Sequence, residues 1–478
     1  MSNTVTILSA ALIAIDLIIC VIIAKVTSRN SQDENDYYLA GKSVGPVLLF
    51  LTAWASFSGA GNFIGAAGRG ALYGISAVWA WAGETLCAGI VLATVLAPYL
   101  ARFSYISMPH YIAAHLFGDD KIVRIFSGIS AFLPNVIWPG AQIMGISYVM
   151  EQAFGIDYRI AVLICGAVLI LHTTTGGIKA VIYADALHGI IQLIFAALVL
   201  FFGLRLFNFS FSDLGTAVQQ HTPERWNLFV DRPGVLITSF LTGFVGALSS
   251  PQYWNRAFVA KDAKSARSSF GITFFLNIIM VLMITLIGVF GYTLNEEAGD
   301  QTLVWLLLNK MPPICAVILP VGVFASCMSC ADTHLNCASA NIVVDVIEQV
   351  IDVPGDKKIR CAKICTLISG IISIACGLCG DFIYGLGTYG YTVCGGVLIP
   401  LFVMGLITRD KDKGCSTLNT VAVRIGMILG IVVAVCFESI PSLYSLLSGG
   451  VIPAIAATVF GVLIPNVFLK NKSVPSVG

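Results

Sequence analysis

Apolar stretches of about 20 residues, the length at which a helix crosses a bilayer, recur along this whole chain. They predict about thirteen membrane-spanning helices. No long polar segment separates them, so we expect one all-α membrane domain that crosses the bilayer many times. By hydropathy the stretches lie near residues 5–26, 46–66, 75–98, 123–152, 158–175, 182–207, 233–252, 270–293, 313–346, 361–380, 382–407, 416–438 and 449–469.

The composition indicates that most of the protein surface faces a lipid bilayer. Hydrophobic residues make up 57% of the chain and charged residues only 11%, whereas a soluble protein is about 25% charged. The net charge of +1 does not provide the strong positive charge that attracts nucleic acid. The 14 cysteines lie almost entirely in apolar runs, which is typical of buried reduced thiols rather than of zinc sites. We expect a multi-pass protein of the plasma (cell) membrane, with no obligate protein partner.

The positive charges predict the orientation. Lys and Arg gather in alternate connecting segments, and such segments face the cytoplasm. The pattern holds from end to end with the N-terminus outside and the C-terminus inside. The segments assigned to the cytoplasm carry Lys25, Arg29, Lys42, Arg102, Lys121, Arg124, Lys179, Arg256, Lys261, Lys264, Arg267, Lys357, Lys358, Arg360, Lys363, Arg409, Lys411, Lys413, Lys470 and Lys472.

Two stretches are rich in residues that weaken a helix. Residues 55–61 are almost all Ser, Gly or Ala, and residues 243–251 combine Gly, Ser and Pro. Small residues can serve close helix packing, or they can mark an unwound segment whose carbonyl groups face a site. Interrupted helices in corresponding positions of two halves point to a transporter site. We expect an extra helix and loop at 1–45, inverted repeats at 46–207 and 233–407, and two C-terminal helices at 408–478.

The stretch at 313–346 is the most polar of the predicted spans. Ser326, Ser329 and Cys330 share one helical face, and hydroxyl oxygens suit small cations. Each serine could instead bond back to its own helix. Ionisable groups within spans are candidate functional groups. We expect interfacial or helix-pairing roles for Asp16 and Glu438, and no evident partner for His188 or His334.

Five blocks of the chain together resemble the sodium:solute symporter family, which includes proline, pantothenate, sialic acid and glucose cotransporters. They occur in the family's order and cover nearly the whole chain. The blocks are DYYLAGKSVGP at 36–46, TTGGIKAVIYADALHGIIQL at 174–193, PQYWNRAFVAKDAKSAR at 251–267, MSCADTHLNCASANIVVDV at 328–346 and GLITRDKDKGC at 405–415.

The resemblance implies a leucine-transporter-like (LeuT-like) core of two inverted repeats, about five helices each. It also implies sodium-coupled symport of a small organic solute by alternating access. Carried over from the family, the sodium site falls on the carbonyl groups of Ala55, Ser58 and Ser326 and on the side chains of Ser329 and Cys330. Asp185 matches an acidic residue associated with ion exit or a further ion.

The chain departs from the family pattern at Cys330, where members usually have Ser or Thr. A thiol is a poor ligand for sodium, so proton coupling through Asp185 or Asp332 is the alternative. For the solute, Phe57, Asn62 and Glu84 are the candidate contacts, and a small amino acid or carboxylate is the expected class.

Three other classes compete with a carrier. A channel would lack stoichiometric coupling of ion and solute. A membrane-embedded enzyme would need a nucleophile–base pair or a metal triad, which the sequence does not indicate. A transporter-like sensor would need a cytoplasmic output domain. We therefore expect a carrier that is not an enzyme.

Overall fold

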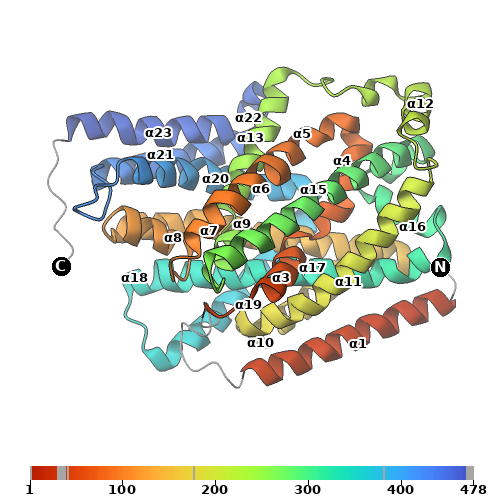
Figure 1. Cartoon of the computed structure of the whole chain (residues 1–478), viewed down its shortest axis with the longest axis horizontal. Coiled ribbons are helices and arrows are strands. Elements are labelled where there is room, and N and C mark those ends of the chain that lie inside the picture. Colours follow the sequence, from red (N-terminus) through yellow and green to blue (C-terminus); the bar gives the residue numbers. More distant parts are fainter. Residues whose placement is uncertain (1–2, 29–38, 40–41, 176–177, 381–382, 470–478) are drawn as a thin grey trace.

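In the computed structural model of this chain, the described residues, 3–28, 39, 42–175, 178–380 and 383–469, form helices and connecting loops (Figure 1). The β-pairing among them is confined to isolated bridges, Val44 with Ala260 and Arg409 with Ser416. The first half contains α1 (Asn3–Ser28), α3 (Pro46–Phe57), η2 (Gly61–Gly65), α4 (Ala66–Tyr73), η3 (Gly74–Ala77), α5 (Val78–Trp81), η4 (Ala82–Cys87), α6 (Ala88–Val91), η5 (Leu92–Leu96), α7 (Ala97–Leu100), α8 (Met108–Tyr111), η6 (Ile112–Leu116), α9 (Lys121–Phe154), α10 (Tyr158–Thr175), α11 (Ile178–Arg205), α12 (Phe211–His221) and η7 (Pro223–Trp226). The second half contains α13 (Pro233–Ser249), α14 (Pro251–Phe258), α15 (Ala263–Leu294), η8 (Glu296–Gln301), α16 (Thr302–Asn309), α17 (Pro313–Ile342), η9 (Val343–Ile347), α18 (Glu348–Val350), α19 (Gly355–Cys379), α20 (Ile383–Ile407), α21 (Thr420–Ser439), α22 (Pro441–Leu447) and α23 (Val451–Phe468).

The membrane character of the chain is confirmed, since 11 helical segments of the described part are long and apolar enough to cross a bilayer. Two shorter apolar helices, Pro46–Phe57 and Tyr158–Thr174, accompany them. One segment, Gly61–Leu100, runs for 40 residues, and a straight helix of that length would measure about 60 Å against a hydrocarbon core of about 30 Å. Gly74 ends α4 within this run with a φ of +67°, a conformation that favours glycine. The number thirteen, the inverted repeats and the orientation stay predictions.

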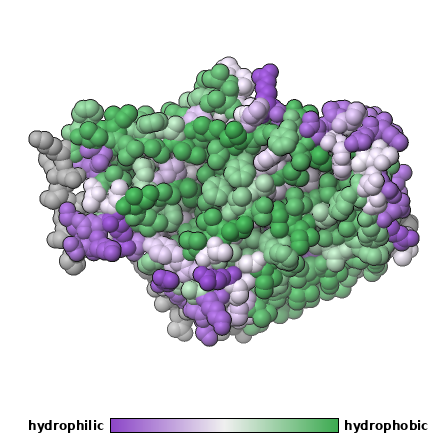
Figure 2. Space-filling view, turned by 45° about the horizontal axis from the view of Figure 1, so that its top comes forward, coloured by the Kyte–Doolittle hydropathy of each residue, from purple (hydrophilic) through white to green (hydrophobic). Residues whose placement is uncertain are grey.

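The surface fits a bilayer. Figure 2 shows a broad hydrophobic band across the middle of one face, with hydrophilic residues gathered toward its ends. Large aliphatic side chains stay exposed on the outer faces of several long helices, for example Leu171 at 68% and Ile407 at 77%. Exposure of these apolar side chains to water would be unfavourable, whereas lipid can surround them without that cost.

The polar helix α17 lies at the centre of the bundle. It packs against α9, α11, α1, α3 and α19. In the most apolar 18-residue stretch of the segment Pro313–Val350, 83% is buried inside the protein. Its serines, threonine, aspartate and histidine would be costly in lipid. Other helices therefore shield α17 from the bilayer, with α1 and α10 along one long edge of the molecule and α21 and α23 along the opposite edge (Figure 1).

Two interrupted helices meet near this central helix. α3 breaks after Phe57, and the run from α13 to α14 breaks at Ser250. The residues before α3 and after α14 are joined, since Val44 N–H donates to Val259 O at 3.4 Å and Lys261 N–H donates to Val44 O at 3.0 Å. α3 also packs against α11, α15 and α17. This arrangement places both breaks inside the protein, where unwound backbone is tolerated.

Candidate functional site

The first interrupted helix breaks at Ser58 and Gly59. The φ and ψ of Ser58, −102° and 64°, are not helical, and the chain resumes as the π-helix η2. Gly59 has no room for a side chain, because an added Cβ would lie 2.4 Å from Gln142 Oε1 and 2.9 Å from Cys330 Sγ. The freed Ala60 N–H donates to Gln142 Oε1 at 2.6 Å. The break therefore lies directly against α9 at Gln142 and against α17 at Cys330.

A glutamine side chain bridges the broken helix and α17. Gln192 Nε2 donates to Ala55 O at 3.2 Å and lies 3.5 Å from Ala325 O. In an unbroken helix, Ala55 O would accept the N–H of residue 59. Gln192 was not among the predicted site residues. The sign of it in the sequence was that its amide side chain interrupts the apolar stretch 189–200 of α11.

The predicted ligands on α17 point in different directions. The Ser326 hydroxyl donates to Gly322 O at 2.7 Å and so bonds back to its own helix. The Ser329 hydroxyl donates to Asp185 Oδ1 at 2.5 Å. Cys330 faces the break at Gly59. Of the three, the structure places Cys330 directly against the break in α3. The role of these residues as sodium ligands stays a prediction.

Asp185 belongs to a buried ion pair. Arg256 Nη2 lies 2.6 Å from Asp185 Oδ2 and also donates to Ser56 Oγ at 2.9 Å and to Thr333 Oγ1 at 2.6 Å. Thr52 Oγ1 donates to the same carboxylate oxygen at 2.7 Å. Both charged side chains are at most 1% exposed. Burial of two charges is tolerated when further hydrogen bonds surround them, and α3, α11, α14 and α17 supply these bonds.

The placement of Arg256 in a cytoplasmic connecting segment was wrong. Its side chain is 0% exposed and lies on α14. Ser250 is extended, and Pro251 then begins a new helix, a position that proline favours. The residues after the break therefore continue inside the protein, where the Asp185 carboxylate compensates the guanidinium charge.

The expectation that His188 and His334 lack partners was also wrong. His188 Nε2 lies 3.1 Å from Asp16 Oδ2 and 3.5 Å from Cys20 Sγ. His334 Nδ1 lies 2.7 Å from Asn135 Oδ1. These partners come from helices far away in the sequence, so no local pattern could reveal them.

The three predicted solute contacts, Phe57, Asn62 and Glu84, line one central cavity. Its volume of about 10 Å³ is close to the minimum that holds one water molecule. Asn62 Nδ2 donates to Asn277 Oδ1 at 2.9 Å. An organic solute would therefore need the walls to move apart. Six further polar or aromatic residues line this cavity and were not predicted as solute contacts: Trp138, Gln142, Gln252, Tyr253, His334 and Tyr391.

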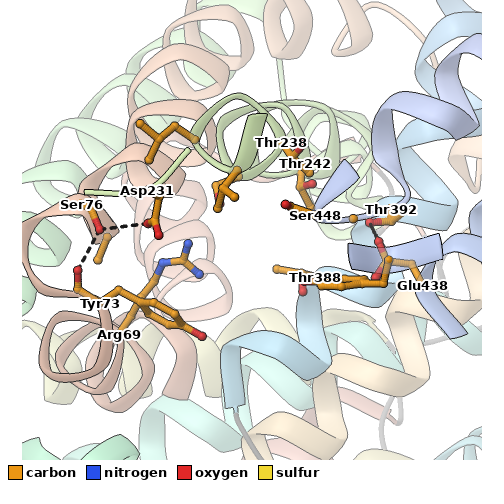
Figure 3. Close-up of a pocket in the computed structure, with 16 residues that line it drawn as sticks. Arg69, Tyr73, Ser76, Asp231, Thr238, Thr242, Thr388, Thr392, Glu438 and Ser448 are labelled. Carbon is orange, nitrogen blue, oxygen red and sulfur yellow. Dashed lines mark hydrogen bonds between the residues drawn. The ribbon is translucent and has the colours of Figure 1, made fainter. Parts of the chain in front are cut away.

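A larger cavity of about 330 Å³ opens where α4 ends, α13 begins and α21 ends. Figure 3 shows Arg69 and Asp231 on one side of it and Glu438 on the opposite side. Glu438 Oε1 accepts hydrogen bonds from Thr392 Oγ1 and from Gly450 N–H, each at 2.8 Å. The cavity therefore presents charges of both signs.

Curated relatives of similar length are transporters. The chain is 23% identical over 403 residues to the "Osmoregulated proline transporter OpuE" of Bacillus subtilis, with 80% of this chain and 81% of that protein covered. It is 23% identical over 465 residues to the "Sodium/proline symporter" of Escherichia coli, with 93% and 90% covered. Among solved structures, a Na⁺-coupled sialic acid symporter in a substrate-bound outward-open state matches with a TM-score of 0.76 and 17% identity, over 98% of this chain and 99% of that one. That likeness supports the fold.

A family model covers most of the chain. Residues 37–415 match the sodium:solute symporter family, which consists of transporters rather than enzymes. The match spans the break in α3, the buried Asp185–Arg256 pair and the polar helix α17. Membership indicates sodium as the coupling ion. The chain belongs to the sodium:solute symporter family.

Proposed function

We propose that this protein is a secondary active transporter of the plasma membrane, which couples sodium entry to the symport of a small organic solute. The observation that carries the proposal is the break in α3, which lies against α17 at Cys330. Interrupted helices supply backbone carbonyl groups to ions near the middle of the membrane. We propose that the single chain is the transporting unit.

In this proposal the sodium ion binds between α3 and α17. The carbonyl groups of Ala55, Ser58 and Ser326 and the side chains of Ser329 and Cys330 are its ligands. The contact of Ala55 O with Gln192 Nε2, at 3.2 Å, supports the availability of that carbonyl outside the helical hydrogen-bond ladder. Sodium would take the place of the amide there. Asp185, bonded to Ser329, would accept the ion on its way out.

Alternating access would use the two ends of this site. The cavity beside Arg69 and Glu438 would open to the outside, and the Asp185–Arg256 network would close the path to the cytoplasm. A ligand shifts such an equilibrium only if it binds one state more tightly than the other. Sodium bound between α3 and α17 would favour the outward-open state, and one charge moving inward gains about 2.3 kcal/mol per 100 mV.

The central cavity is the proposed solute site. Phe57, Asn62 and Glu84 combine an aromatic face, an amide and a carboxylate, which suits a small solute with an amine and an apolar part. We propose an amino acid, with a small carboxylate as the next class to test. The proline transport named for two relatives supports the amino acid.

Proton coupling is the second candidate, and Cys330 favours it. The thiol lies against the break in α3, yet it is a poor sodium ligand. In that case Asp185 or Asp332 would carry the proton. An imposed pH gradient would then drive uptake in the absence of sodium.

A solute panel in proteoliposomes tests the proposal. An inward sodium gradient should drive accumulation of at least one amino acid or carboxylate, and a potassium gradient should not. Counterflow should saturate with solute, because a carrier reorients once for each solute molecule. Flux that never saturates would indicate a channel. Binding without any flux would indicate a sensor.

A further inference from the structure

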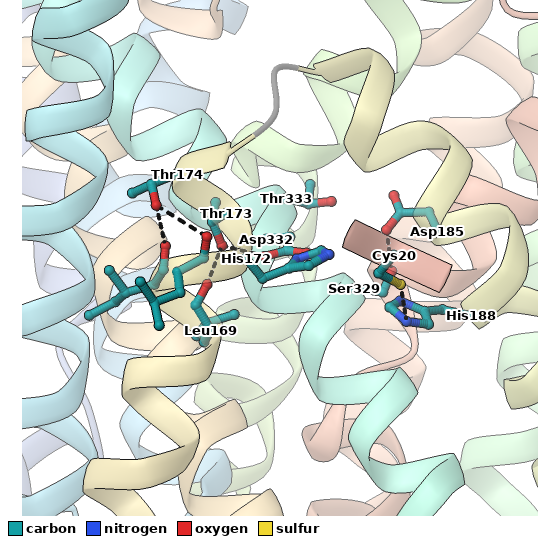
Figure 4. Close-up of polar contacts among 12 residues, drawn as sticks. Cys20, Leu169, His172, Thr173, Thr174, Asp185, His188, Ser329, Asp332 and Thr333 are labelled. Atoms are coloured by element: carbon teal, nitrogen blue, oxygen red, sulfur yellow. Dashed lines mark hydrogen bonds and ion pairs between the residues drawn. The ribbon is translucent and has the colours of Figure 1, made fainter. Parts of the chain in front are cut away.

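A buried group of metal-binding side chains lies apart from the break in α3. Asp16 and Cys20 are four residues apart on α1, so both face the same neighbour, and that neighbour is His188 on α11. One ligand atom from each of the three lies within 4.8 Å of the other two. The three residues are 5%, 1% and 1% exposed. Figure 4 shows Cys20 joined to His188.

The spacing of these atoms matches a tetrahedral zinc site. With Zn–S near 2.3 Å and Zn–N or Zn–O near 2.0–2.1 Å, the sulfur–nitrogen edge of a tetrahedron is about 3.6 Å and the nitrogen–oxygen edge about 3.3 Å. The observed edges are 3.5 Å for Cys20 Sγ to His188 Nε2 and 3.1 Å for Asp16 Oδ2 to His188 Nε2. Zinc could therefore enter with side-chain shifts of a few tenths of an ångström.

A second histidine completes the surroundings of the cluster. His172 on α10 lies near Cys20 (Figure 4), and its Nδ1 lies 2.5 Å from Asp332 Oδ2 on α17. Figure 4 shows His172 and Asp332 together on the side facing Cys20. Carboxylates orient metal-binding histidines in this way. His172 is therefore the natural fourth ligand, and Asp332 is the residue that orients it.

The cluster also contains unsatisfied polar atoms. In the described part of the chain, Asp16 Oδ1 and His188 Nδ1 are buried without a hydrogen-bond partner. Buried polar atoms are normally paired, so a hydrogen-bonded Asp–His pair does not fully account for the group. A metal ion bound by these side chains would give the Asp16 carboxylate an additional partner.

We propose that Asp16, Cys20 and His188, together with His172, form a structural zinc site that fastens α1 to the transport core. Thiolate and imidazole ligands select zinc over sodium, magnesium or calcium. The divalent charge would balance the Asp16 carboxylate and the Cys20 thiolate. Zinc binds the Cys20 thiolate and neutral imidazole, so binding releases the thiol proton to solvent. His188 follows Asp185 by three residues on α11, so the metal would also fix the helix that carries the buried ion pair.

The test uses the full-length protein, purified in detergent and supplied with zinc chloride. We expect about one zinc ion per chain after dialysis, and X-ray absorption at the zinc edge should show a single sulfur ligand. The variants Cys20→Ser and His188→Gln should lose the zinc. Cys165→Ser, which replaces a buried cysteine of α10 outside the cluster, should keep it.

Three results would overturn the proposal. These are wild-type protein that retains no zinc, a metal with two sulfur ligands or none, and zinc content unchanged in Cys20→Ser. The first two are read on the wild type, so the test stands even if the variants do not fold. All three are independent of transport, and therefore of the proposed function.

Discussion

Removal of one charge from the buried Asp185–Arg256 pair should destabilise the protein far more than removal of both. Arg256→Gln leaves a carboxylate that is at most 1% exposed without its cation. Breaking a buried pair in this way costs about 3–5 kcal/mol. The double variant Asp185→Asn with Arg256→Gln replaces two charges by two amides that can still bond to each other and to Thr52, Ser56 and Thr333. It should recover most of that loss.

The assay is a thermal unfolding series on detergent-purified protein, with wild type, both single variants and the double variant. We expect a non-additive result with a coupling of about 2–3 kcal/mol, in the upper part of the range of about 0.5–3 kcal/mol found for residues within one network. Arg424→Gln is the matched control. Arg424 pairs with Asp120 but is 32% exposed, and partly exposed pairs contribute about 0–1 kcal/mol. Additive losses at Asp185 and Arg256, or equal losses at Arg256 and Arg424, would refute the reasoning.

Further predictions concern the break and the cavity. Cys330→Thr should lower the sodium concentration that half-activates uptake, because a hydroxyl is a harder ligand than a thiol; an unchanged or higher value would contradict the argument. Gly59→Ala should abolish uptake, because an added Cβ would lie 2.4 Å from Gln142 Oε1. The control Gly45→Ala should keep uptake, because an added Cβ there meets nothing within 4 Å. Full uptake by Gly59→Ala would show that the break is not closely packed. Asn62→Ala should raise the KM for solute at least about tenfold if a hydrogen bond worth about 1.5 kcal/mol is lost, with sodium activation unchanged; an unchanged KM would remove this residue from the solute site.

The sequence was most informative where local chemistry decides the structure. Apolar length identified the membrane helices, and the small residues at 55–61 identified the break, which occurs at Ser58 and Gly59. The cluster of Gly, Ser and Pro at 243–251 likewise marked the interruption at Ser250. Each of these features depends on residues within a few turns of one another.

Features made by distant helices could not be read from the sequence. Arg256 looked like a loop cation, because its partner Asp185 lies 71 residues away in the sequence. His188 looked unpartnered, because Asp16 is 172 residues away. Gln192 was one amide in an apolar helix, and only the packing of α11 beside α3 and α17 gives it a role.

The central claim, a sodium ion held between α3 and α17, is tested most directly by the sodium activation of uptake in proteoliposomes that contain Ser329→Ala. If loss of the hydroxyl costs the free energy of a hydrogen bond to a charged group, about 1.5–3 kcal/mol, half-activation should need roughly 10- to 150-fold more sodium. The amount of folded protein should stay close to that of the wild type. A sodium activation curve that superimposes on the wild-type curve would contradict the proposed site.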